Sequence, residues 1–421
     1  MNICDYIEWR GDLSFEADPF CEADALIFAW LSYYPAEKLM LTMEQMESLT
    51  LKSLYEIHLQ QIGEIKDMNV KLNINPTDSG IYLLKLAALS DRFGSVRVLR
   101  FRTMFSQEDN TQFAAFTYEY LPRQIAISYR GTDGSVTGWR EDFMMCCSDA
   151  IPSQHLAREY LEAEDPGRYD SVILCGHSKG GNIAMHALLY TGDETRKHVT
   201  KLYNFDGPGF PVPMESIPCY AEVKDRIITI LPESSIIGML MEHEDDFIII
   251  ESEMVSMLQH NAMLWSLKRR EFIRKDDFSS SSQFIDKALH SWLASLSNEE
   301  KEKFVNVTFD ALEDAGITDF TDIGPSTIPK IFSLIGNMVT IDSESRKNLI
   351  KVIMAVMQAG GNTVVSSLKE NELVSSISNG IETVTDTVGK GFDTVTDTMG
   401  KAVDAGIGKL KSLFGGPKNN G

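Results

Sequence analysis

The sequence carries one serine in a setting that suits nucleophilic catalysis, within Gly176-His-Ser-Lys-Gly-Gly181. Before it, Val172–Cys175 is a short apolar run typical of a strand buried on both faces, and from Asn182 onward apolar residues recur at helical spacing. A sharp turn from strand to helix would lift the Ser178 hydroxyl above the sheet and direct a helix N-terminus at a bound ligand. The small residues that permit such a turn are Gly176, Gly180 and Gly181. The pattern therefore predicts a nucleophile elbow, with a glycine-rich turn and a bystander serine as the alternative.

A nucleophilic serine requires a base, and the chain offers eight histidines. In an α/β-hydrolase the order along the chain is serine, acid, histidine, which excludes the histidines that precede the serine. His260 lies in a loop shortly after the last apolar strand-like run, where the base is expected. His243 lies among acidic residues typical of a surface, and His290 lies on an amphipathic helix. We therefore predict His260 as the base, with a histidine that caps a loop as the alternative.

Two carboxylates are candidates for the acid that orients the base. Asp206 follows the strand-like run 201–205 in a glycine-rich turn, at the strand end where ligand-binding residues collect in α/β sheets. Glu233 follows the next strand-like run, which is the commoner position for this acid. Aspartate is the more usual orienting acid, and the neighbouring glycines suit a backbone pressed against a site. We prefer Asp206 and keep Glu233 as the alternative acid; an Asx turn without a catalytic role is the alternative for Asp206.

Donors are also needed for the negative oxygen that forms in the tetrahedral intermediate. One is expected to be the backbone N–H of Lys179, directly after the nucleophile. The second is expected in the loop Arg130-Gly-Thr132, which follows the strand-like run 124–129. Thr132 offers its N–H and its hydroxyl there, so Thr132 and Lys179 are the predicted oxyanion hole. This chemistry requires no metal and no organic cofactor.

The elements that would position these residues indicate a largely parallel sheet. The strand-like runs lie at 96–105, 113–120, 124–129, 172–175, 201–205, 226–231 and 246–250. The first three are closely spaced, which favours an antiparallel pair that feeds the main sheet. The others alternate with helical patterns, which is typical of parallel strands with helices on both faces. We therefore expect an α/β-hydrolase fold with a C-terminal helical appendage.

The chain is longer than one ordinary domain, and its pattern changes along its length. We expect an extended arm over residues 1–20, then helices that pack on the hydrolase core, and beyond the core a serine-rich linker and a helical region. The last part contains an 11-residue repeat whose apolar stripe over 381–414 would pack on protein or lie on a lipid surface. The expected parts are the arm with the N-terminal helices (1–94), the hydrolase core (95–275), the helical region (276–370) and the repeat tail (371–421).

The elbow and the loop before it resemble class 3 (fungal-type) lipases over roughly residues 95–265. Those enzymes carry F-R-G-T and G-H-S-L-G-G motifs, and this chain has Tyr129-Arg-Gly-Thr132 and Gly176–Gly181. The resemblance implies a hydrolase of carboxylic esters, lipid esters in particular. Where those lipases have leucine after the serine, this chain has Lys179, which would place a cation beside the oxyanion site and favour a polar or anionic substrate.

A wider pattern resembles the Mbeg-like family of α/β-hydrolase-related bacterial proteins of unknown function, and covers most of residues 1–310. Its motifs in this chain are Tyr6-Ile-Glu-Trp-Arg-Gly-Asp12, Phe205-Asp-Gly-Pro-Gly-Phe210 and Gln259-His-Asn261 with Trp265. The resemblance implies a bacterial source and a hydrolase-related fold, and it implies no activity.

Composition narrows the class of protein further. The net charge of −22 argues against nucleic-acid binding and against electrostatic capture by anionic lipid. The six cysteines show no C-x-x-C spacing, the first residues do not form a signal peptide, and no apolar run approaches the length of a membrane span. We therefore expect a cytoplasmic serine ester hydrolase that could contact a lipid surface through residues 381–414. The alternatives are a catalytically silent binding or scaffold protein and a thioesterase.

Overall fold

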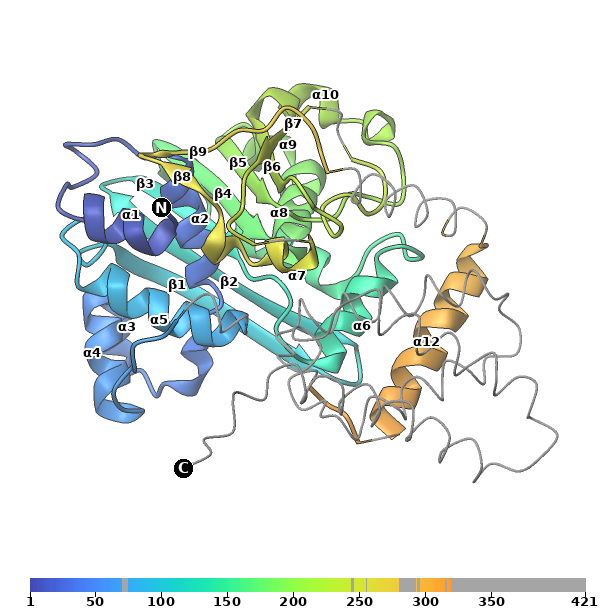
Figure 1. Cartoon of the computed structure of the whole chain (residues 1–421), viewed down its shortest axis with the longest axis horizontal. Helices are drawn as coiled ribbons and strands as arrows, with labels where there is room; N and C mark the ends of the chain where they lie inside the picture. The colour runs from blue at the N-terminus through green and yellow to red at the C-terminus, as the bar shows by residue number, and fades with distance from the viewer. Residues whose placement is uncertain are drawn as a thin grey trace, which may run out of the picture.

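The computed structural model describes residues 1–69, 75–243, 246–254, 256–279, 293, 296–314 and 316–319 (Figure 1). Its centre is a seven-stranded sheet in which the strands lie in the order of the sequence. The first three strands pair antiparallel and β3 to β7 are parallel. The strands are β1 (Arg97–Ser106), β2 (Thr111–Leu121), β3 (Gln124–Tyr129), β4 (Ser171–His177), β5 (Val199–Phe205), β6 (Ile227–Pro232) and β7 (Phe247–Ile250). This mostly parallel sheet is the one expected of an α/β-hydrolase fold.

The register of the parallel strands brings three loops together. Tyr129, the last residue of β3, pairs with Gly176 of β4, and His177 at the end of β4 pairs with Phe205 at the end of β5. Parallel strands that end in register place the residues that follow them at one edge of the sheet. The loop after β3, the turn after β4 and the turn after β5 are therefore neighbours.

Helices cover both faces of the sheet, which explains the continuous apolar runs of its strands. In β4, Val172 and Leu174 face the helices α7 (Pro152–Ala163) and α8 (Lys179–Tyr190), whereas Ile173 and Cys175 face the N-terminal helices. The other elements after β3 include α6 (Val136–Met144), α9 (Asp193–Arg196), α10 (Tyr220–Val223) and the small pair β8 (Leu267–Lys268) and β9 (Glu271–Phe272).

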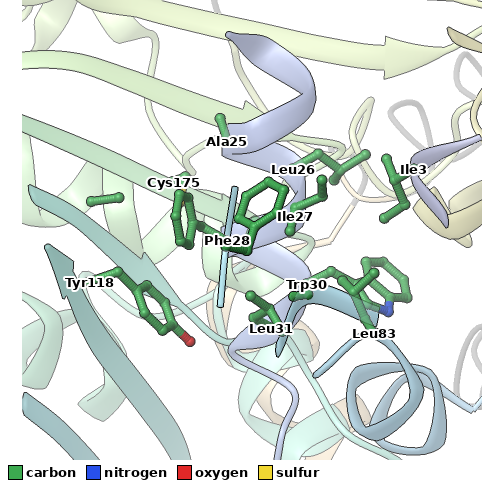
Figure 2. Packing of buried hydrophobic residues seen from close by; sticks show 14 of the residues in the cluster. Ile3, Ala25, Leu26, Ile27, Phe28, Trp30, Leu31, Leu83, Tyr118 and Cys175 are labelled. Atoms are coloured by element: carbon green, nitrogen blue, oxygen red, sulfur yellow. The ribbon is translucent and has the colours of Figure 1, made fainter. Parts of the chain in front are cut away.

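Helix α2 (Glu22–Leu31) is the main cover of the second face, where it packs against β3, β4 and β5. Every residue of α2 after Glu22 is buried. Figure 2 shows its apolar side chains, Phe28 among them, with Tyr118 and Cys175 of the sheet and Leu83 of α5 (Pro76–Ala88). Burial of a side chain as large as that of Phe28 contributes roughly 1.5–3 kcal/mol, so this helix is part of the core. The other helices on this side are α3 (Met43–Glu47), α4 (Leu51–Gln61) and α5 (Pro76–Ala88).

The expectation of an extended arm over residues 1–20 is wrong, because the chain begins with helix α1 (Ile3–Arg10). Asn2 caps this helix by accepting hydrogen bonds from the backbone N–H groups of Cys4 and Asp5, and the Asp5 carboxylate accepts from the N–H of Asn2. This reciprocal capping satisfies donors that the first turn would otherwise leave unpaired, and so favours a helix over an extended arm.

Helix α12 (Asn298–Asp314) packs against α6 on the side of the molecule opposite the N-terminal helices (Figure 1). It is the described part of the expected helical appendage. Most of 276–370, and all of the repeat tail 371–421 with its stripe 381–414, lie outside the described residues, and the division into four parts stays a prediction. Within the described residues, no helix combines the length and the apolar character that crossing a membrane requires.

Candidate active site

Ser178 stands alone between the end of β4 and the start of α8, with φ 58° and ψ −132°. A positive φ is unfavourable for a residue with a side chain and persists only where the surroundings impose it. A Cβ atom at Gly176 would collide with the carbonyl oxygen of Gly180, and one at Gly180 would collide with that of Tyr129. These glycines therefore allow strand and helix to approach closely enough to form the elbow, and Gly181 is buried beside them in the first turn of α8.

Ser178, His260 and Asp206 form a hydrogen-bonded series. The Ser178 hydroxyl donates to Nε2 of His260 over 3.0 Å, and Nδ1 of His260 donates to the Asp206 carboxylate over 2.6 Å. A carboxylate only accepts hydrogen bonds, so the ring proton lies on Nδ1 and Nε2 is left as the acceptor that a base requires. All three residues are buried. The structure thus brings together the three residues that the sequence predicted for nucleophile, base and acid, whose catalytic roles stay predictions.

Asp206 directly follows β5 and has a φ of 52°, which turns its side chain toward His260. Its second carboxylate oxygen accepts from the Ser235 hydroxyl over 2.5 Å and from the backbone N–H of Gly238 over 3.2 Å. The alternative acid, Glu233, lies elsewhere, with its carboxylate 3.8 Å from the Lys275 ammonium. Asp206 is therefore the carboxylate that the fold places against His260, the predicted base.

The two predicted oxyanion-hole residues lie on the loop after β3 and on the elbow. Lys179 is the first residue of α8, so its backbone N–H has no partner within the helix and is free to bind an anion. The loop that carries Thr132 lies directly against the elbow, because a Cβ at Gly131 would collide with the carbonyl oxygen of His177. The Thr132 hydroxyl donates to the carboxylate of Asp142 on α6, which fixes the side chain of Thr132.

A model of the Mbeg1-like family matches residues 87–310, more than half of the chain. This chain belongs to the Mbeg1-like family. None of the curated proteins matches it. Among solved structures it is similar to the crystal structure of M37 lipase, with 14% sequence identity, coverage of 51% of this chain and 68% of that chain, and a TM-score of 0.31. The residues matched by the family include Ser178, Asp206 and His260, whereas helices α1 to α4 precede them.

In this Mbeg1-like protein the Lys179 side chain does not present a cation to the oxyanion site, so that expectation is wrong. Its ammonium is fully buried and donates to the Gln112 carbonyl over 2.8 Å, to the Gln112 side chain over 2.7 Å and to the Glu141 carboxylate over 2.9 Å. These three bonds use all three of its donors. A buried ammonium without such partners would be costly, so the side chain extends toward α6, where the counter-charge lies.

The cluster around Lys179 changes the pKa of two of its members. Burial would lower the pKa of Lys179, but Glu141 and then Asp142 outweigh burial and raise it. Burial raises the pKa of Asp142 to about 7, although Lys179 and the Thr132 hydroxyl oppose the shift. Asp142 therefore titrates near neutral pH, one hydrogen bond from a predicted oxyanion residue.

Sequence reasoning missed two residues beside the loop of His260, one that contacts this loop and one that contacts the first. His177 was excluded as the base, yet its buried ring donates from Nε2 to the carbonyl oxygen of His260 over 2.8 Å. Tyr33, two residues after the end of α2, bonds Nδ1 of His177 over 2.9 Å from a position 144 residues earlier. No motif links residues so far apart. Of the other candidate bases, His243 contacts Phe247 at a ring separation of 5.6 Å and His290 lies outside the described residues.

Within the described residues, no group of three or more histidine, cysteine, aspartate or glutamate side chains is arranged to hold a metal ion. Two of the acidic residues near the elbow, Glu141 and Asp142, face the Lys179 ammonium at 2.9 and 3.6 Å. The cluster thus already contains a cation of its own.

Proposed function

We propose that this Mbeg1-like protein is a serine hydrolase that cleaves carboxylic esters. The observation that carries the proposal is the hydrogen-bonded series of Ser178, His260 and Asp206 at a strained elbow. Nucleophile, base and orienting acid in this geometry are the parts of acyl transfer to serine, and they recur on unrelated folds.

In the proposed reaction the Ser178 hydroxyl attacks the ester carbonyl carbon while Nε2 of His260 takes its proton. The resulting imidazolium is stabilised by Asp206, whose own position is fixed by Ser235 and Gly238. The same proton then passes from Nε2 to the leaving alkoxide, which gives an acyl-enzyme and an alcohol. A water molecule attacks the acyl group in the second half of the cycle, with His260 again as the base.

The negative oxygen of each tetrahedral intermediate would be bound by the backbone N–H groups of Lys179 and Thr132. A donor of this kind contributes about 2.7–4 kcal/mol to transition-state stabilisation. Lipid esters are the substrate class suggested by the lipase-like motifs Tyr129–Thr132 and Gly176–Gly181. The proposal includes no role for a cationic side chain in substrate choice, because the Lys179 ammonium is fully bonded elsewhere.

The test is labelling of the full chain with a fluorophosphonate probe, read by intact mass. The wild type should gain one adduct, and Ser178→Ala should gain none while it unfolds at the same temperature. Ser252→Ala removes another buried serine and serves as the matched control, with labelling as in the wild type. A folded wild type without an adduct would favour the catalytically silent scaffold instead. If an adduct forms, turnover of matched ester and thioester substrates separates an esterase from a thioesterase.

We further propose that the protein is cytoplasmic and contacts lipid surfaces through residues 381–414. All six cysteines are unpaired, which suits a reducing compartment. The spacing of apolar residues in the repeat suits a helix that folds at an interface. Circular dichroism of a 381–414 peptide with zwitterionic phospholipid vesicles tests the lipid contact, and a spectrum unchanged by vesicles would refute it. Cell fractionation tests the compartment.

A further inference from the structure

The ring of His177 has a fixed protonation state that follows from its two partners. Its Nε2 lies 2.8 Å from the carbonyl oxygen of His260, and a carbonyl oxygen only accepts, so Nε2 carries the proton. Its Nδ1 must then accept the hydrogen bond from the Tyr33 hydroxyl, over 2.9 Å. Both ring nitrogens are then hydrogen-bonded. In the other tautomer, Nε2 would face the carbonyl oxygen of His260 without a proton to donate.

His177 also stays uncharged. Its ring is buried, lies 4.6 Å from the ring of His260, centroid to centroid, and contacts the rings of Trp30 and Trp265. Burial, with repulsion from His260 in addition, holds the pKa of His177 well below its usual range. His260 can therefore gain a proton during the proposed reaction without a second cation beside it.

The loop that carries His260 depends on such contacts. His260 ends a short 3-10 turn, Ser256–His260, and belongs to no strand of the sheet. Two successive carbonyl groups of this loop accept from ring N–H groups: that of Gln259 from Trp265 over 2.7 Å, and that of His260 from His177. The elbow that carries the nucleophile thereby also holds the main chain of the base.

Tyr33 connects this arrangement to the oxyanion loop. Its side chain is buried, and its hydroxyl occupies the space where a Cβ at Gly131 would lie. Burial raises the pKa of Tyr33 far above its usual value, so the hydroxyl stays protonated and remains a donor. One hydroxyl from the turn that follows α2 thus lies between the loop of Thr132 and the ring of His177.

We propose that Tyr33 and His177 are positioning residues of the active site, which keep Nε2 of His260 within hydrogen-bonding distance of the Ser178 hydroxyl. The proposal rests on the serine hydrolase function proposed above. Tyr33 lies before the residues 87–310 that the family match covers, so the N-terminal segment that covers the sheet also completes the site.

Four single variants of the full chain test this proposal. His177→Leu removes the bond to the His260 carbonyl and should lower kcat for p-nitrophenyl acetate by about 100-fold with KM unchanged, because small displacements of a catalytic group have effects of this size. His177→Gln keeps an N–H donor at that place and should recover most of the loss. Tyr33→Phe should lower kcat by about 5- to 10-fold, the effect of one hydrogen bond. Tyr34→Phe is the matched control, since the Tyr34 hydroxyl bonds His58 over 2.9 Å in a similar buried pair.

Fluorophosphonate labelling rates and unfolding temperatures of the same variants separate the possible outcomes. Slower labelling in Tyr33→Phe and His177→Leu, with recovery in His177→Gln and no change in Tyr34→Phe, supports the proposal. Labelling of Tyr33→Phe at the wild-type rate overturns it, and so does a His177→Gln variant as slow as His177→Leu. If His177→Leu does not fold, the labelling rate of Tyr33→Phe alone decides whether the proposal holds. A folded wild type that does not label at Ser178 would instead remove the proposed function itself.

Discussion

The two halves of the candidate site are held in different ways. The base half, around His260, is positioned by two hydrogen bonds in which donor and acceptor cannot exchange roles. The His177 ring donates to the backbone carbonyl of His260, and the His260 ring donates to the Asp206 carboxylate. The oxyanion half, around Thr132, is positioned by buried charges, because the Asp142 carboxylate that bonds Thr132 faces the Lys179 ammonium. We infer that the base half depends on hydrogen-bond geometry, whereas the oxyanion half depends on charge balance.

The two halves also connect to different parts of the fold. The base half reaches through Tyr33 to the N-terminal helices on one face of the sheet. The oxyanion half reaches through α6 to α12, where Arg140 bonds Asp310 over 2.7 Å. In addition, the backbone N–H of Val136 donates to the carbonyl of Thr318, just beyond α12. A variant that changes hydrogen-bond geometry should therefore affect the base half, and a variant that removes a buried charge should affect the oxyanion half.

Asp206→Asn should have the largest effect, a loss of about 10⁴-fold in kcat with little loss of stability. The amide retains the shape of the carboxylate but can present an N–H to Nδ1 of His260, which favours the wrong tautomer. Steady-state ester hydrolysis and labelling rate measure this effect. Glu233→Gln is the control, because Glu233 faces Lys275 and should label as the wild type does. The reverse ranking of these two variants would make Glu233 the orienting acid.

Lys179→Met should have the next largest effect, on stability. Removal of one partner of a buried ion pair costs about 3–5 kcal/mol, since the remaining charge is left without compensation. Urea unfolding should show this loss, and a Lys179→Met, Glu141→Gln double variant should be less destabilised than the sum of the two single variants. Additive losses would mean that Lys179 and Glu141 do not interact energetically, and the oxyanion half would then not depend on charge balance.

Much of the fold follows from local patterns in the sequence. The run at 124–129 matches β3, and the elbow follows from a glycine-flanked serine between an apolar strand and a helical pattern. Both predictions rest on residues that are adjacent in the sequence, so the sequence alone contains the pattern. The first helix was missed, because its capping box of Asn2 and Asp5 is a short polar signal within a mixed sequence.

Contacts between distant residues are what the sequence could not supply. The choice of Asp206 over Glu233 depends on where β5 ends in the sheet, and sequence order left both open. The direction of the Lys179 side chain depends on Gln112 and Glu141, which come from β2 and α6. No local pattern specifies such partners, because each becomes a neighbour only through the assembled sheet.

Asp142→Asn should change how stability depends on pH. The pKa of Asp142 is raised from 3.8 to about 7 in the folded protein, first by burial. Between these values the folded chain holds a proton that the unfolded chain has lost, so the contribution of Asp142 is complete below pH 3.8 and declines as pH rises to about 7. Relative to Asp142→Asn, the wild type should lose up to roughly 1.4 kcal/mol per pH unit in this range. Urea unfolding at several pH values measures this difference, and a constant difference would contradict the shift.

Arg140→Gln should have the smallest effect. This variant tests whether the charge network of the oxyanion half extends to α12. Arg140 bonds Asn306 and Asp310 of α12 over 3.0 and 2.7 Å, but the Asp310 carboxylate is more than half exposed, at 58%. Solvent screens such pairs, so the variant should lose about 1 kcal/mol or less in the free energy of unfolding and label at nearly the wild-type rate. Limited proteolysis should show α12 released more readily. A slowing of labelling as large as that of Tyr33→Phe would instead mean that α12 helps to position Thr132, and that both halves of the site depend on helices outside the sheet.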